Sequence, residues 1–219
     1  GYGATYNPSK NSLKLPQLIA LKASADATLA DVITKNTNYN NKVNERITAF
    51  SGLKSLSTRL VNALQTTDAT TETIGNAKTF NRKMQGKKAS SSQTPTDPNT
   101  PAPTTISTSQ QSYDQLIQHL SGLTSVLEAE TSYTPNETDL QVATLQTKIA
   151  DLTTKNTAVA TAYASISNSR IERNETLYSS STGLVETANE VKKYIKSVFG
   201  ASSPQFAQVK GIQFKIIKN

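Results

Sequence analysis

The single histidine is the residue of this chain that could act as a general base. His119 is the only imidazole, and a Ser-His-Asp site would depend on it. Its neighbours Gln118 and Leu120 belong to an amphipathic helical pattern, and the chain has no nucleophile-elbow glycines. We therefore interpret His119 as a residue at the boundary of a helical core.

Two pairs of glutamates, Glu172 with Glu175 and Glu186 with Glu190, lie at helical spacing. Acid–base catalysis needs carboxyl groups in one enclosed environment, whereas these have lysines and arginines close by, which indicates surface ion pairs. The absence of Cys excludes thiolate metal sites and thiol nucleophiles, and a di-iron bundle needs more than one His. We expect no catalytic, metal-binding or cofactor-binding residue, and a protein that is not an enzyme.

Basic residues gather near the end of a short helical pattern, in a chain whose net charge is +7. Such a cluster favours salt-dependent, non-specific binding to phosphates. Phe80 and Met84 lie four residues apart and are explained more simply as core contacts, and no familiar nucleic-acid motif is present. Nucleic-acid binding is therefore an alternative function. The candidate phosphate contacts are Lys78, Arg82, Lys83, Lys87 and Lys88.

Residues 191–200 combine an apolar face with three lysines. This pattern is typical of a helix that lies on a membrane surface. It is equally typical of the last helix of a bundle, whose lysine stems cover the core. Membrane-surface binding is the second alternative, and the bundle is favoured.

The strongest helical signal is a heptad seam between residues 142 and 170. The run Thr134-Pro135-Asn136-Glu137 is typical of a helix start, so we expect a helix over 135–178. A weaker seam from 18 to 50 predicts a second long helix, and Pro16 is suited to its first turn. The predicted interaction seam comprises Leu145, Ile149, Leu152, Asn156 and Val159, with Leu29, Val32 and Asn36 opposite.

Asn36 and Asn156 occupy equivalent places in these two seams. An Asn in an apolar seam lowers stability but fixes register and partner choice. The two amides could hydrogen-bond to each other, or both could point toward a wet edge. The sequence leaves both arrangements open.

Two pairs of similar segments indicate a degenerate duplication. LADVITKNT at 29–37 matches IADLTTKNT at 149–157, and STRLVNA at 57–63 matches STGLVET at 181–187. The first pair of segments lies 120 residues apart and the second pair 124 residues apart. The difference of four residues is about one helical turn, so an insertion of this length keeps the same helix face buried. With only two copies, the repeat favours a pseudo-symmetric bundle over a solenoid.

A stretch rich in Pro, Ser and Thr at 88–109 cannot bury apolar area and indicates a linker. We predict a first helical half at 1–87 and a second at 110–219 that pack as one compact unit. Shorter helices are expected at 52–66, 70–85, 108–131 and 181–199.

The last residues alternate in polarity from Ile212 onward and predict a short extended segment. A single strand needs a partner, so 206–217 could add to the edge of a partner's sheet. The candidate strand contacts are Phe206, Val209, Ile212, Phe214 and Ile216.

Three stretches resemble all-helical proteins of Bacteroidota whose functions are uncharacterised. They are TRLVNAL (58–64), AKTFNRKMQGKKAS (77–90) and RNETLYSSSTGLVETANEVKKYIKSVFGASSPQF (173–206). The resemblance implies a bacterial source and an all-helical build. It implies no activity, ligand or catalytic residue.

The expected fold is all-α: an elongated antiparallel helical bundle with two pseudo-repeated halves and a short extended C-terminal segment. Long helices gain most of their stability from packing. The expected function is therefore a non-enzymatic structural or protein-interaction bundle that can self-assemble. The expected partner is a protein or a second copy, with nucleic acid less favoured, a membrane unlikely and no small-molecule substrate. A cytoplasmic location is weakly favoured, and export stays open because the N-terminus can be a processed one.

Overall fold

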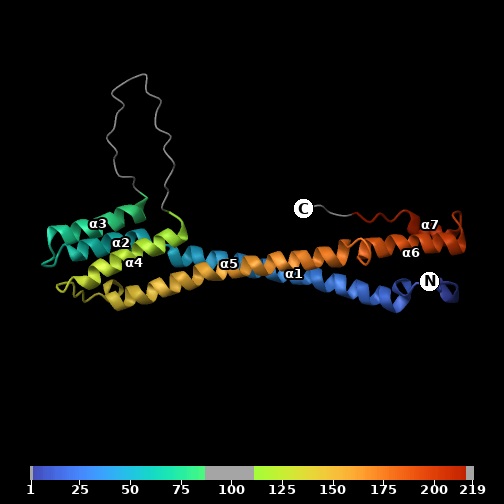
Figure 1. Cartoon of the computed structure of the whole chain (residues 1–219), viewed down its shortest axis with the longest axis horizontal. Coiled ribbons are helices and arrows are strands. Elements are labelled where there is room, and N and C mark those ends of the chain that lie inside the picture. Colours follow the sequence, from blue (N-terminus) through green and yellow to red (C-terminus); the bar gives the residue numbers. More distant parts are fainter. Residues whose placement is uncertain (1, 87–110, 216–219) are drawn as a thin grey trace, which may run out of the picture. The chain divides into compact units, whose positions relative to one another are not determined.

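The computed structural model describes residues 2–86 and 111–215, and every regular element in these ranges is helical (Figure 1). The all-α class is confirmed. The linker expected at 88–109 and the candidate contacts Lys87, Lys88 and Ile216 lie outside the described residues. The helices are α1 (Leu15–Phe50), α2 (Leu53–Leu64), α3 (Thr71–Gln85), α4 (Tyr113–Ala129), α5 (Val142–Tyr178), α6 (Leu184–Phe199) and α7 (Pro204–Lys210), with short 3-10 helices η1 (Gly3–Thr5), η2 (Asn11–Leu13) and η3 (Thr138–Leu140).

The helix ends follow local capping chemistry. The Thr70 hydroxyl accepts a 3.2 Å hydrogen bond from the Thr73 N–H at the start of α3, and Ser112 accepts one of 3.2 Å from the Gln115 N–H at the start of α4. Gly52 separates α1 from α2 with a φ of 78°. This left-handed conformation carries no penalty for glycine, so the chain can turn there.

The start of α5 differs from the sequence-based expectation. The helix begins at Val142, and the expected start at 135 is wrong. The Tyr133 hydroxyl donates a 2.9 Å hydrogen bond to the Leu140 carbonyl, and both side chains are buried. Because this turn folds back onto the core, the intervening residues, with η3 among them, cannot continue the long helix.

The chain forms two compact units. The first unit comprises Gly1–Asn41 and Thr161–Asn219, and the second comprises Lys42–Ala160. Both long helices contribute to both units. Each unit therefore combines residues from the two halves expected from the sequence, and the division differs from those halves.

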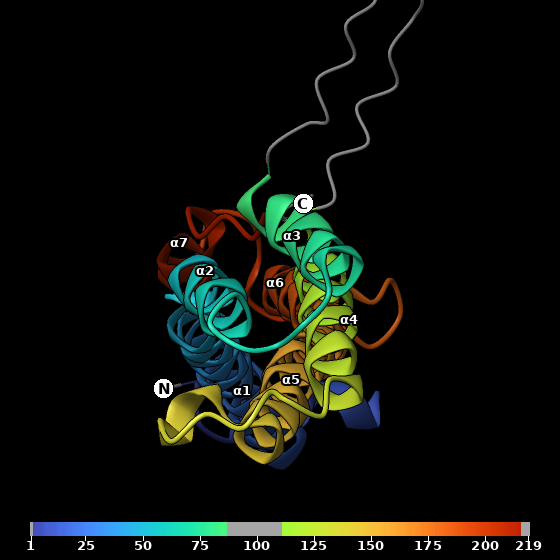
Figure 2. The same cartoon turned by 90° about the vertical axis from the view of Figure 1, so that its left-hand side faces the viewer.

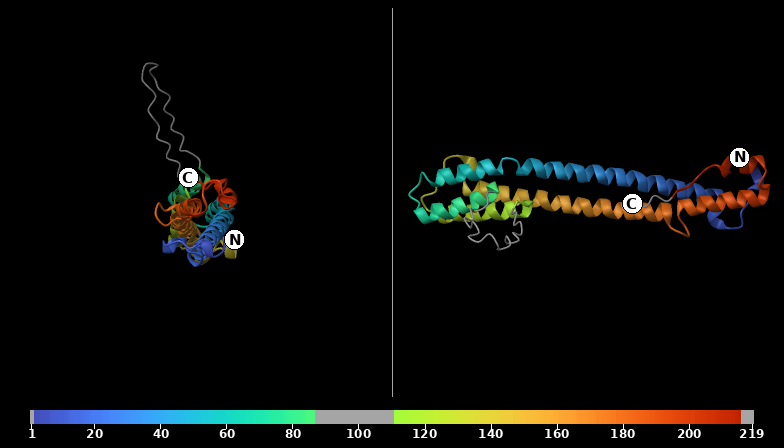
Figure 3. Two further views of the ribbon diagram at one scale, coloured as in Figure 1. Left: turned by 90° about the vertical axis from the view of Figure 1, so that its right-hand side faces the viewer. Right: turned by 90° about the horizontal axis from the view of Figure 1, so that it is seen from above.

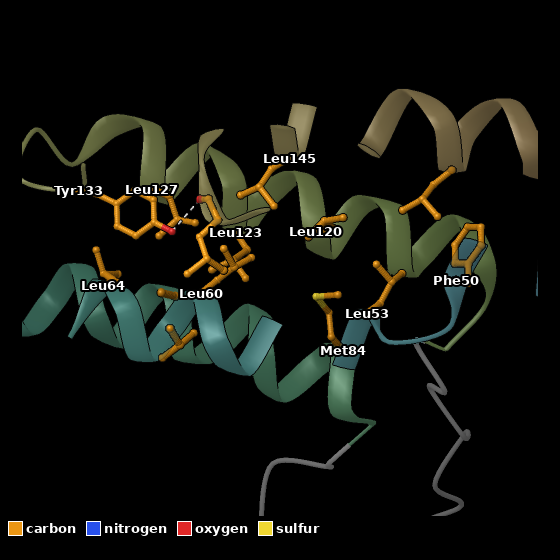
Figure 4. Packing of buried hydrophobic residues seen from close by; sticks show 14 residues of the cluster. Phe50, Leu53, Leu60, Leu64, Met84, Leu120, Leu123, Leu127, Tyr133 and Leu145 are labelled. Atoms are coloured by element: carbon orange, nitrogen blue, oxygen red, sulfur yellow. Dashed lines mark hydrogen bonds between the residues drawn. The ribbon is translucent and has the colours of Figure 1, made fainter. Parts of the chain in front are cut away.

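In the second unit, the end of α1, the helices α2, α3 and α4 and the first part of α5 enclose one apolar core (Figure 2). Leu60, Leu64, Met84 and Leu120 are fully buried there (Figure 4). Each buried side chain of this size stabilises the fold by about 1.5–3 kcal/mol. Packing between helices thus carries the stability of this unit.

In the first unit, α1 and α5 run antiparallel. The Ser169 hydroxyl donates a 2.7 Å hydrogen bond to Asp31, and the ring centroids of Tyr39 and Tyr163 are 5.9 Å apart. A later residue of α1 thus meets an earlier residue of α5. The N-terminal segment lies against α6 (Figure 3).

The C-terminal segment differs in part from the extended segment expected over 206–217. Phe206 and Val209 lie in α7, and residues 211–215 follow it without regular structure, so the described residues contain no strand. The Ser203 hydroxyl accepts a 3.1 Å hydrogen bond from the Phe206 N–H, and Pro204 occupies the first helical turn. This local capping explains the helix at Phe206 and Val209, whereas the alternation begins only at Ile212. The pseudo-repeat and the bundle of the whole chain remain predictions.

Candidate interaction surfaces

The predicted seam of α5 lies on its buried face. Leu145, Leu152 and Val159 are seven residues apart and buried, and Ile166 continues the series. Tyr163, which the heptad places in the same seam, is 58% exposed. Eighteen residues are five full helical turns, so Tyr163 points in the same direction as the buried Leu145, and the buried face of α5 does not keep one direction along the helix.

Asn156 and Ile149 are half-buried on this face. The Asn156 Oδ1 accepts a 3.1 Å hydrogen bond from Arg46, and its Nδ2 donates a 2.7 Å bond to Asp114. These partners come from α1 and α4 of the second unit. The structure thus gives Asn156 other partners than Asn36.

Further contacts extend this polar cluster in the second unit. The Arg46 guanidinium lies 4.0 Å from the centroid of the Tyr113 ring. Glu45 accepts hydrogen bonds from Lys42 at 2.9 Å and from Lys155 at 3.3 Å. These two bonds and the lysine charges lower the pKa of the Glu45 carboxyl, against a smaller opposing effect of burial. The charged groups are engaged with one another, so the cluster joins helices rather than offering a reactive group.

The opposite side of the predicted seam belongs to the first unit. Val32 and Asn36 are half-buried there, whereas Leu29 is 43% exposed. The residues predicted to face them, from Leu145 to Val159, belong to the second unit. The structure thus assigns the two predicted sides to different units.

A surface of which the predicted seam includes only Leu29 lies on α1 within the first unit. Leu15, Ile19, Leu29 and Ile33 are 62%, 61%, 43% and 68% exposed, and we call these four residues the α1 stripe. They lie within an arc of about 80° around the helix, since each residue turns it by about 100°. Apolar residues four apart, at 15/19 and 29/33, indicate this second apolar face in the sequence. Only one weak seam is predicted from the sequence for this helix.

The candidate phosphate contacts of α3 point to solvent. Lys78, Arg82 and Lys83 are exposed, while Met84 is buried in the core, as its spacing predicted. Phe80 packs against the core and lies against α4. The structure therefore presents three cations of the predicted cluster on one short helix.

The apolar face of residues 191–200 packs inside the first unit. Ile195 is buried, the Tyr194 ring lies 5.3 Å from that of Tyr6, and the Phe199 ring lies 5.5 Å from that of Tyr2. Tyr194 and Phe199 thus lie against the N-terminal segment, whereas Val198 on the same face is 40% exposed. Among the described residues, no helix is long and apolar enough to span a bilayer.

An apolar cavity of about 220 Å³ lies in the first unit between α1, α6 and the segment after α7. Leu21, Val191 and Phe214 are among its lining residues. The Lys192 ammonium donates a 2.6 Å hydrogen bond to the carbonyl of Ile212 and so holds this segment over the cavity. Three of the predicted strand contacts, Val209, Ile212 and Phe214, thus line an apolar cavity that is open to solvent, and Ile212 and Phe214 are 48% and 37% exposed.

The residues with catalytic potential form no shared site. His119 is buried within α4. Glu190 pairs with Lys10 at 2.5 Å and Glu186 approaches Lys193 at 4.0 Å, so these carboxylates form surface ion pairs. Within residues 2–86 and 111–215, no group of three or more metal-binding side chains is present.

Comparison with known proteins found no relative of this chain. No protein-family model, no curated protein and no solved structure matches this chain.

Proposed function

We propose that this chain is a non-enzymatic structural protein that acts through protein–protein contact, and that a second copy of itself is the first contact to test. The α1 stripe is the observation that carries the proposal. A helix in a monomeric protein commonly exposes single apolar residues, which need no explanation. Four large ones at heptad-related positions along one face are typical of a helix that packs against another helix.

The helix α1 already has a covered face. Ala25 and Thr28 are buried inside the first unit, and their direction lies roughly 100° around the helix from the stripe. The stripe is therefore a second apolar face, separate from the one that folding of the unit uses. Fully burying a Leu or Ile side chain contributes about 1.5–3 kcal/mol. The side chains that two copies of the stripe bring together act against the cost of association, which is about 4–15 kcal/mol.

Light scattering after size-exclusion chromatography tests this proposal. We expect a discrete dimer or larger species whose mass is unchanged by nucleic acid. The double variant Ile19→Gln/Ile33→Gln should be a monomer, because it makes the stripe polar while Gln keeps a high helix propensity. Ile47→Gln is the matched control, since Ile47 is 52% exposed on α1 but belongs to the second unit, and it should still associate.

A wild-type monomer at every concentration would overturn self-association. Nucleic-acid binding is the alternative that one observation favours, namely the exposed cations Lys78, Arg82 and Lys83 on α3. It predicts a mass that increases with nucleic acid at low salt only. Replacing these three residues by Ala should then abolish the increase, while the stripe variants should leave it unchanged.

A further inference from the structure

The α1 stripe contains two charged residues between its apolar pairs. Lys22 and Asp26 lie within the same arc of the helix, and they form an exposed ion pair of 2.6 Å. Along this face the side chains therefore follow the order apolar, apolar, basic, acidic, apolar, apolar. The residues in that order are Leu15, Ile19, Lys22, Asp26, Leu29 and Ile33.

Read in the opposite direction, this order again has apolar residues at the same places and has the basic and acidic residues exchanged. Residue numbers placed symmetrically about position 24 pair Leu15 with Ile33, Ile19 with Leu29, and Lys22 with Asp26. A two-fold axis perpendicular to the helices brings the same patch of two copies together in opposite directions. Apolar residues then meet apolar residues, and each ammonium meets a carboxylate.

The geometry points to a second copy of this chain as the occupant of the α1 stripe, with the two α1 helices antiparallel about a two-fold axis at the level of Ser24. The inference rests on the proposed function and specifies its partner, direction and register. A parallel pair in register would place Lys22 against Lys22 and Asp26 against Asp26 of the two copies. Such like-charge pairs oppose association, so the pattern favours the antiparallel pair.

The covered face of α1 is compatible with this arrangement. The directions of Ala25 and of the stripe differ by roughly 80–100°, which is close to the angle between two neighbours at one corner of a four-helix bundle. Each α1 can thus contact its own unit on one side and the second copy on the other. Small exposed residues, Ala23 and Ala30, border the stripe and leave room for close approach of the helices.

The two kinds of residue have different roles in this pair. Exposed ion pairs contribute about 0–1 kcal/mol each, so the apolar side chains provide most of the affinity. At the centre the charges of Lys22 and Asp26 from both copies alternate in sign, and this alternation sets direction and register. Added salt should therefore weaken the dimer only slightly.

Cysteine cross-linking tests the register, because the natural chain has no Cys that could interfere. In the inferred pair, position 19 lies against position 29 of the second copy. Two residues at position 19 are ten residues apart along the axis, or about 15 Å, which is beyond the reach of a disulfide. An equal mixture of Ile19→Cys and Leu29→Cys should form a disulfide-linked dimer under mild oxidation, and neither variant should do so alone.

A charge exchange provides a second, independent test. Lys22→Asp and Asp26→Lys should each weaken the dimer by about tenfold, since each creates two like-charge contacts, or about 1.4 kcal/mol in total. An equal mixture of the two variants should recover the wild-type affinity in sedimentation experiments. In a parallel pair, neither single variant would add a like-charge contact.

The outcomes separate this inference from the proposed function. A wild-type dimer in which Ile19→Cys cross-links to itself, or in which the mixture gives no cross-link, overturns the antiparallel register and leaves self-association intact. A wild-type monomer overturns both. Ile47→Cys mixed with Ile19→Cys is the control, and a cross-link between them would also contradict the register.

Discussion

Tyr133 fixes the turn before α5 through its hydroxyl group. The hydroxyl donates a 2.9 Å hydrogen bond to the buried Leu140 carbonyl, and Tyr133→Phe leaves that carbonyl without this donor. We expect the free energy of unfolding to fall by about 1 kcal/mol at neutral pH. Urea unfolding followed by circular dichroism measures the change.

The same residue predicts a difference in pH dependence. Burial, assisted by the charges of Glu137 and Asp139, raises the pKa of Tyr133 from 10.0 to about 12. The folded state keeps this proton where the unfolded state loses it, so the contribution is complete below pH 10 and is lost as the pH rises toward 12. The loss is smaller than the value of about 3 kcal/mol that a shift of this size would give without solvent screening. Wild-type stability should therefore fall more steeply above pH 10 than that of Tyr133→Phe, and parallel curves would contradict the assignment.

At the scale of elements, two helical glycines should respond in opposite ways to alanine. A Cβ on Gly122 of α4 would overlap the Phe80 ring of α3, whereas a Cβ on Gly75 of α3 meets nothing within 4 Å. Gly122→Ala should destabilise the protein by about 1–3 kcal/mol, although it raises helix propensity. Gly75→Ala should stabilise it by about 0.5–1 kcal/mol. Thermal unfolding of both variants measures the contrast, and equal shifts would show that α3 and α4 do not approach closely here.

The helices themselves were largely predictable, because their signals are local. The ranges expected at 52–66, 70–85 and 181–199 agree within a few residues with α2, α3 and α6. The start of α5 was not predictable, since it depends on Tyr133 and Leu140 packing into a core made by distant segments. Local composition carries no information on such packing.

The interaction surface was predictable only in part for a related reason. Periodicity shows that a helix has apolar faces but not which face its own unit covers. Leu29 is predicted in one interaction seam with Val32 and Asn36, yet it lies in the exposed stripe, while Ala25 and Thr28 are buried. The partners of Asn156 were also out of reach, because Arg46 and Asp114 lie on two other helices and are far away in the sequence.

At the scale of the whole molecule, composition marks where the chain is polar but not which helices pack together. The Pro-rich stretch at 88–109 predicted a division into an N-terminal and a C-terminal half. The long helices α1 and α5 instead pass through both compact units, so each unit draws on both halves. A long amphipathic helix can serve two cores, and a boundary inside it leaves no trace in composition.

Association through α1 also predicts how stability depends on protein concentration. A dimer that binds only folded chains raises the melting temperature as concentration rises. Above the dissociation constant, each tenfold increase should contribute about 0.7 kcal/mol per chain, half of the 1.4 kcal/mol that corresponds to a factor of ten. For a chain of 219 residues this corresponds to about 1–3 °C. Ile33→Gln should make the melting temperature independent of protein concentration, because it places an amide in the α1 stripe. Ile47→Gln should behave like the wild type. A wild-type melting temperature that is constant over a hundredfold range of concentration would show that the stripe does not bind a second copy.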